Sequence, residues 1–227
     1  MKSIAWCITA YEYVDPYAAA GFLQSALALS RLGYDVEPFV QTGMSCEAAC
    51  NEIMERVERR ERERGSRFTH IFWMDDDVIV KPDEFERWIP MVDGRHRAMF
   101  GLAFYRVEPH QPGIWRHVAD TTLSTGARME HFVDYPENEL VQVSCAGLCA
   151  AIFDRSVFNI ISKPYFQWVE GGYARSGCTP DAFLCGKLSS AGVTLWCHTG
   201  IQLKHVGVPQ LIDSEIARPH KERWAEV

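Results

Sequence analysis

The sequence predicts a single α/β domain with a Rossmann-like, mostly parallel central sheet that is flanked by helices. Three observations support this class. The 227 residues are 47% hydrophobic, which is enough apolar material for one large core. Along the first half of the chain, short apolar runs typical of buried strands alternate with longer segments of helical periodicity. Such alternation is typical of parallel strands joined by right-handed helical crossovers.

The first half of the chain is expected to hold four strands and three helices. The third strand is uniformly apolar after its first residue, as a strand buried on both faces should be. Gly33 ends the first helix, and Pro82 begins the third, in which apolar residues recur at helical spacing. The expected strands are Ser3 to Thr9, Val36 to Val40, His70 to Met74 and Ala98 to Tyr105, and the first two helices are Ala18 to Leu32 and Ser45 to Arg64.

The second helix carries two further expectations. Ser45 is predicted to cap it, and Ala49, Ile53 and Val57 form its buried stripe. The far half, Glu55 to Arg64, is almost entirely charged. We interpret this half as a solvated helix end that is held by ion pairs between residues four apart.

The second half of the chain is less periodic. Residues 106–140 contain several prolines and glycines and are expected to form loops or short strands over the sheet edge. Residues 164–180 are aromatic and glycine-rich. The remaining expected elements are apolar strand structure over Val141 to Phe153, a helix from Pro180 to Ala191 that Gly192 ends, and a late strand from Val193 to Trp196.

Composition narrows the function. Thirty acidic residues against 23 basic ones give a net charge of −7, which argues against a general nucleic-acid-binding protein but not against a small basic groove. No apolar run reaches the ~18 residues that span a bilayer, and we interpret Ile4 to Ala10 as a buried strand rather than a secretion signal. We expect no membrane partner and a cytoplasmic location, in the host cytoplasm if the protein is viral.

The eight cysteines are expected to be reduced and to pack as small hydrophobic residues. Because no Cys-x-x-Cys pair occurs, a structural zinc site is not expected.

The strongest local signal is the run Asp75-Asp76-Asp77, directly after the third expected strand. Like charges at a buried strand end call for a compensating cation, and ligands of open α/β sheets bind beyond the carboxyl ends of the strands. Asp75 and Asp77 could approach one divalent ion together. A role in capping the next helix is less favoured, since Pro82 and Asp83 already begin that helix.

Two enzyme classes place such a pair after a strand. In haloacid-dehalogenase-type phosphatases the first Asp is the nucleophile, but their motif has Thr or Val two residues after the second Asp, where this chain has Ile79. In glycosyltransferases the pair holds a divalent metal against a nucleotide diphosphate, whose developing charge the metal neutralises.

Six segments favour the second class through their order and spacing. They are Thr69 to Pro82, Phe100 to Arg106, Ala146 to Phe158, Pro164 to Phe166, Thr179 to Cys185 and Lys204 to Gly207. Together they resemble the GT-A family of nucleotide-sugar glycosyltransferases, particularly small soluble members from bacteria and bacteriophages. The first segment resembles the family's Asp-x-Asp strand and the turn behind it, and the last resembles its terminal His-x-Gly. The resemblance covers most of the chain and implies a GT-A-like fold.

The resemblance also implies an activity, which is transfer of a sugar from a nucleotide diphosphate sugar, with a UDP-sugar as the first donor to expect. Asp181 would be the catalytic base of an inverting reaction, because an acceptor hydroxyl needs a carboxylate to take its proton. Asp75, Asp77 and, from the far end of the chain, His205 would hold Mn²⁺ or Mg²⁺. The nucleotide would be approached by Thr9, Tyr11, Asn51, Asp75 and Asp76, and the acceptor by Arg106, Gly147 and Trp168.

The expected organisation is a donor half over residues 1–105, an acceptor half over 106–207 and a tail over 208–227. The acceptor is either a modified base in phage DNA, which would have to leave the base stack, or a glycan or small molecule.

Three positions depart from the family pattern. Ala10 stands where the family has Pro, Cys50 stands where Arg is common, and Pro180 replaces the Glu of a Glu-Asp pair. The last departure leaves a retaining reaction open. An Asp-x-Asp phosphohydrolase and a non-catalytic nucleotide-sugar-binding module are the alternative functions.

Overall fold

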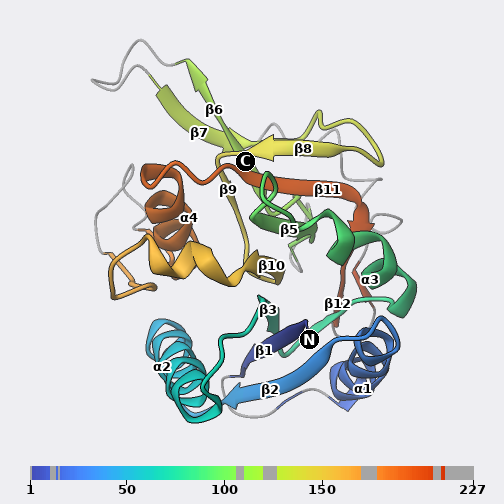
Figure 1. Ribbon diagram of the computed structural model, residues 1–227. Coiled ribbons are helices and arrows are strands. Elements are labelled where there is room, and N and C mark those ends of the chain that lie inside the picture. The colour runs from blue at the N-terminus through green and yellow to red at the C-terminus, as the bar shows by residue number, and fades with distance from the viewer. Residues whose placement is uncertain are drawn as a thin grey trace.

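The computed structural model describes residues 2–10, 14, 16–105, 110–119, 127–169, 178–206 and 211–212 (Figure 1). A seven-stranded sheet forms its centre, so the α/β class predicted from the sequence is confirmed. Its strands are β1 (Ser3–Thr9), β2 (Asp35–Gln41), β3 (His70–Asp75), β5 (Ala98–Leu102), β8 (Leu140–Val143), β10 (Ala150–Asp154) and β11 (Leu195–Gln202). Their order across the sheet is β2-β1-β3-β10-β5-β11-β8.

Most strands of this sheet point in one direction. β1 pairs in parallel with β2 and β3, and β5 pairs in parallel with β11. β10 runs antiparallel between β3 and β5, and β8 runs antiparallel along β11. The carboxyl ends of β1, β3 and β5 therefore meet at one edge of the sheet.

Helices cover both faces of the sheet. In Figure 1, α1 (Pro16–Arg31) and α3 (Pro82–Trp88) lie on one face, and α2 (Cys46–Arg64) and α4 (Pro180–Ser190) lie on the other. β1 is buried along its whole length because it contributes to both cores. Ile4, Trp6 and Ile8 pack toward α1 and α3, whereas Ala5 and Cys7 pack toward α2. None of the helices in the described part of the chain is long and apolar enough to cross a membrane.

Two smaller sheets are added at the periphery. One joins β4 (Val78–Ile79), β12 (Lys204–Val206) and β13 (Leu211–Ile212), and so brings β12 beside the turn after β3. The other joins β6 (Ile114–Ala119), β7 (Ala127–His131) and β9 (Cys145–Ala146). Two short 3₁₀ helices, η1 (Ile89–Met91) and η2 (Arg155–Asn159), follow α3 and β10.

Several boundaries differ from those predicted. The fourth strand, β5, ends at Leu102 rather than at Tyr105. Phe104 no longer pairs with β11 and forms an isolated bridge with Pro112 instead. The apolar run from Val141 to Phe153 is divided among β8, β9 and β10, which belong to two sheets. Of the expected tail over 208–227, the described residues Leu211–Ile212 form β13.

Ser45 is the N-cap residue of α2, but its side chain makes no capping hydrogen bond, so that part of the prediction is wrong.

The charged half of α2 is also different from its predicted form. Two of its arginines reach across to β2, with Arg60 Nε 2.7 Å from Glu37 and Arg64 Nη2 3.0 Å from Asp35, and Arg60 also lies 3.5 Å from Glu63 one turn along the helix. Glu61 is not solvated but buried, and it pairs with Arg155 at 2.8 Å. The helix end is therefore held mainly by contacts with other elements, with one ion pair along its own surface.

Candidate functional site

The carboxylate cluster lies at the carboxyl ends of neighbouring strands. Thr9 ends β1 and Asp75 ends β3, and the two residues are opposite each other in the parallel register. The Thr9 hydroxyl donates a long hydrogen bond of 3.5 Å to Oδ1 of Asp75. β10 begins beside them, since the backbone N–H of Asp75 donates to the carbonyl of Cys149 at 3.0 Å. This strand edge is where open α/β sheets bind their ligands.

His205 reaches the same region from the far end of the chain. β12 pairs antiparallel with β4, which places His205 opposite Val78, and the N–H of Val206 donates to the Asp77 carbonyl at 2.7 Å. The buried His205 ring donates its Nδ1–H to the Phe104 carbonyl at 2.5 Å. A backbone carbonyl on one ring nitrogen is the contact that orients many metal-binding histidines.

Asp181 enters from the start of α4. The Thr179 hydroxyl caps this helix by accepting the N–H of Ala182 at 3.4 Å, and Asp181 lies in the first turn, where the helix dipole favours a carboxylate. Gly147 lies beside it. A Cβ on Gly147 would be 3.8 Å from Oδ2 of Asp181 and 3.5 Å from Sγ of Cys149. Gly147 therefore lies within van der Waals reach of the carboxylate.

The electrostatics of Asp75 place these carboxylates within range of one another's charge. Burial raises the pKa of Asp75 well above its ordinary value, and repulsion from Asp77 and Asp181 raises it further, with a smaller contribution from Asp76. Two of the repelling groups adjoin Asp75 in sequence, but Asp181 is on a different element. The fold thus brings together negative charges that oppose one another.

The other groups of the cluster respond to the same field. Burial raises the pKa of Asp181, although hydrogen bonds from Thr179 and from the Asp181 and Leu148 backbone oppose the shift. The pKa of the Cys149 thiol is raised well above its usual value by burial and then by Asp75, Asp181 and Asp77. Cys149 is therefore held as a neutral thiol among the carboxylates.

The donor set suits a hard divalent cation. Carboxylate oxygens are the ligands that Mg²⁺ and Mn²⁺ prefer, and a cation would relieve the repulsion at Asp75. Among the described residues, however, no group of three or more His, Cys, Asp or Glu side chains is arranged to hold a metal ion. The role of His205 as a third ligand stays a prediction. Mg²⁺ is commonly bound by one or two carboxylates together with substrate phosphates, and the two Asp residues fit that mode.

Asn51 has a structural role instead of the nucleotide contact that the resemblance implies. Its Nδ2 donates to the carbonyls of Glu47 at 2.8 Å and Phe166 at 2.7 Å. Its Oδ1 accepts from the backbone N–H groups of Tyr165 at 3.1 Å and Phe166 at 3.2 Å. Because these four bonds use the whole hydrogen-bonding capacity of the amide, nothing is left for a base or ribose.

The remaining expected residues are placed only in part. Tyr11 and Arg106 lie outside the described residues. Trp168 is 51% exposed and precedes the bridge between Val169 and Cys178, which leads into α4.

An aromatic cluster next to Asp181 was not foreseen from the sequence. The rings of Trp115 and His131 are 4.9 Å apart, and Tyr105 contacts both at 6.3 and 5.8 Å. The pKa of Tyr105 is raised by burial and then by the charge of Asp181, so the cluster lies within electrostatic range of the carboxylate. Trp115 and His131 come from the aperiodic region after Tyr105, and only the pairing of β6 with β7 reveals that they meet.

Comparisons with known proteins support the architecture. The chain is similar to the crystal structure of A197 from STIV, with a TM-score of 0.55 at 12% identity, over 90% of this chain and 85% of that chain. A glycosyltransferase involved in the glycosylation of the major capsid of PBCV-1 gives a TM-score of 0.37 at 12% identity, over 70% of this chain and 62% of that one. A candidate glucose-1-phosphate thymidylyltransferase from Bacillus anthracis, in complex with sucrose, gives 0.43 at 12% identity, over 99% and 96%.

The first of these similarities shows a shared fold, and the two lower scores carry no argument. No protein-family model matches the sequence, and no curated protein matches it.

Proposed function

We propose that this protein is a metal-dependent glycosyltransferase that moves a sugar from a nucleotide diphosphate sugar to an acceptor hydroxyl. The observation that carries the proposal is the meeting of Asp75, Asp77 and Asp181 near one strand edge, where burial and then repulsion between the carboxylates raise the pKa of Asp75. Such repulsion is a cost that a cation and an anionic ligand together would remove.

The donor side of the proposed site is made of Thr9, Asp75 and Asp77. Asp75 and Asp77 would hold Mn²⁺ or Mg²⁺, which supplies neutralisation of the charge that develops on the leaving diphosphate. The Thr9 hydroxyl, already hydrogen-bonded to Asp75, orients that carboxylate. A UDP-sugar is the first donor to test.

The acceptor side is made of Asp181, Gly147 and the aromatic cluster of Tyr105, Trp115 and His131. A carboxylate with a raised pKa is a stronger base than an ordinary one, which suits the removal of a hydroxyl proton. The aromatic rings offer a surface on which a flat ring, of a sugar or a nucleobase, can stack. Gly147 lies beside Asp181 in this half of the proposed site.

Replacement of Asp181 tests the proposed base. Asp181→Asn keeps the shape of the side chain but cannot take a proton, so release of nucleoside diphosphate from the donor, measured with a panel of acceptors, should fall about 10²–10⁴-fold. Stabilisation of the protein by the nucleotide should be unchanged. In the unaltered protein the rate should fall as the pH is lowered through the raised pKa of Asp181, because protonation removes the base.

The control is Glu86→Gln, which removes an exposed carboxylate on α3 and should change neither property. Full activity in Asp181→Asn would contradict the assignment of the base. Release of phosphate from simple phosphate esters, lost in Asp75→Asn, would favour the phosphohydrolase, and nucleotide binding without any turnover would favour the binding module.

A further inference from the structure

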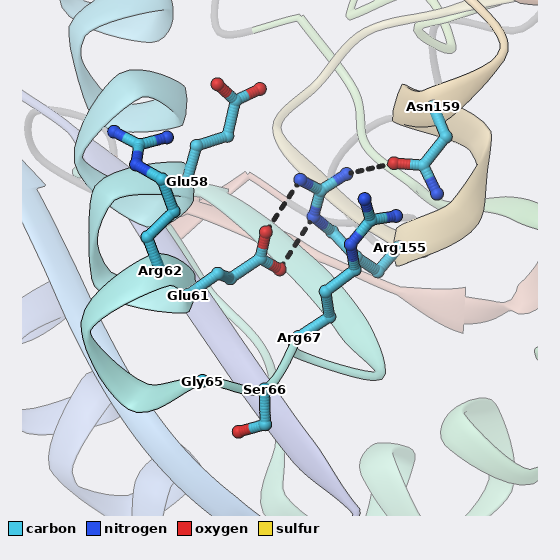
Figure 2. Close-up of a pocket in the computed structure, with 8 residues that line it drawn as sticks. All are labelled: Glu58, Glu61, Arg62, Gly65, Ser66, Arg67, Arg155 and Asn159. Atoms are coloured by element: carbon cyan, nitrogen blue, oxygen red, sulfur yellow. Dashed lines mark hydrogen bonds and ion pairs between the residues drawn. The ribbon is translucent and has the colours of Figure 1, made fainter.

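A cavity of about 560 Å³ lies at the far end of α2 from the carboxylate cluster. Its lining residues come from the last turns of α2, from the loop that follows, and from η2 (Figure 2). They are Glu58, Glu61, Arg62, Gly65, Ser66, Arg67, Arg155 and Asn159. α2 is 19 residues long, which at 1.5 Å per residue separates its two ends by about 28 Å. The cavity is therefore distinct from the proposed active site.

Each acidic residue of the cavity has its own cationic partner. Glu61 forms a two-pronged pair with Arg155, at 2.9 and 2.8 Å, and also accepts the backbone N–H of Phe68 at 3.0 Å. Both side chains of this pair are buried, at 7% and 6% exposure, and Figure 2 shows them joined at the centre of the site. Glu58 pairs with Lys163 at 2.6 Å. The negative charge of the lining is thus neutralised.

Two arginines of the lining have no such partner among the described residues. Arg62 and Arg67 are exposed, and neither side chain makes an ion pair or hydrogen bond with any other residue that the structure describes. In Figure 2 they flank the Glu61–Arg155 pair on opposite sides. Arg155 donates one further bond, to Asn159 at 3.3 Å, so its guanidinium is held by three hydrogen bonds to two partners. In a chain of net charge −7, two uncompensated guanidinium groups at one cavity form a local anion-attracting site.

We propose that this cavity binds a small molecule that carries a phosphate monoester. A phosphate monoester is a dianion whose oxygens match the planar donors of arginine guanidinium groups. The volume is in the range of cavities that hold small ligands. The site is a concave pocket on an acidic molecule, and two of its arginines have no partner among the residues that the structure describes, which favours a small anionic ligand over a nucleic-acid chain.

Isothermal titration with glycerol 3-phosphate and with inorganic phosphate, at constant ionic strength, tests this proposal. Both probes should bind the unaltered protein, and glycerol should not. Arg62→Gln and Arg67→Gln should each weaken binding about tenfold, and the double variant should abolish measurable binding. The matched control is Arg59→Gln, an exposed arginine on the same helix that does not line the cavity, and it should bind as the unaltered protein does. Asp77→Ala should also retain binding.

Other outcomes would overturn the proposal. Absence of binding by both probes excludes a phosphate site, and equal weakening in Arg59→Gln and the arginine variants of the cavity shows only general charge attraction. Loss of binding in Asp77→Ala with retention in the double variant assigns the phosphate to the carboxylate cluster. Binding of a short oligothymidylate but of neither probe would replace the small ligand by a nucleic acid. Unchanged thermal midpoints of the variants without ligand confirm that they are folded.

Discussion

Asp75 illustrates a conflict between stability and the proposed function at a single residue. Its pKa is raised by burial and by neighbouring carboxylates, so the folded protein holds this proton more tightly than the unfolded chain does. The free energy of unfolding therefore falls as the pH rises from the ordinary carboxyl pKa toward the raised value. Above the raised value the whole penalty is present. Such destabilising groups are common where a protein binds ligands.

Removing the charge should relieve this penalty. Asp75→Asn should raise the free energy of unfolding at neutral pH by about 1 kcal/mol, which corresponds to a thermal midpoint about 2–4 °C higher for a protein of this size. It should also flatten the fall of stability with pH. Thermal unfolding of both proteins from acidic to neutral pH measures the difference. A stability curve that is unchanged, or parallel but lower, would show that the carboxylate is not destabilising.

At Asn51 the structure differs from the nucleotide-binding role that the family resemblance implies. The amide of Asn51 binds only backbone groups. Asn51→Ala should therefore remove the hydrogen bonds that join α2 to the backbone of Tyr165 and Phe166. The expected cost is about 1–3 kcal/mol, since buried backbone groups lose their partners. Nucleotide affinity, measured by titration, should stay within about twofold of the original. A loss of affinity with unchanged stability would restore the nucleotide-binding role.

At the scale of elements, the pair Glu61–Arg155 fastens α2 to η2. Both groups are buried, and Glu61 also holds the backbone of Phe68 just before β3. Glu61→Gln would leave a buried guanidinium without its counterion, and breaking such a pair costs about 3–5 kcal/mol. The thermal midpoint should fall by roughly 6–20 °C.

The control for this change is Glu37→Gln, which removes the partner of Arg60 at the exposed edge of β2. Exposed pairs contribute about 0–1 kcal/mol, so this variant should differ little from the original protein. Urea titration of the two variants separates the cases. Equal, small effects would mean that the buried pair does not hold the helix end.

For the molecule as a whole, local sequence patterns predicted the helices and strands but not the position of every strand in the sheet. The apolar run at Ser3 to Thr9 and the helical stripe of Ala49, Ile53 and Val57 depend on neighbours in sequence, and both are found as expected. The insertion of β10 between β3 and β5 depends on contacts between distant segments. Hydrophobic periodicity predicts which faces of a strand are buried, but it does not predict which strands pair with it. The antiparallel placement of β10 could therefore not be predicted from the sequence.

The candidate site shows the same limit. The position of Asp75 at the end of a buried strand was readable because strand and charges adjoin in sequence. The approach of Asp181 depends on the packing of α4, and the meeting of Trp115 with His131 depends on a strand pairing in an aperiodic region. The prediction that Glu61 is solvated is wrong because its partner, Arg155, is 94 residues away in the sequence.

The most direct test of the central claim is thermal unfolding in the presence of UDP, GDP, CDP, ADP or dTDP, each with and without Mn²⁺. A nucleotide at 100 times its dissociation constant stabilises the folded state by ~2.7 kcal/mol, which for a protein of this size raises the midpoint by roughly 5–10 °C. The predicted result is a shift of this size with one nucleotide, dependent on the metal, absent in Asp77→Ala and retained in Glu86→Gln. The absence of a shift with every nucleotide would contradict a nucleotide-sugar site at the carboxylate cluster.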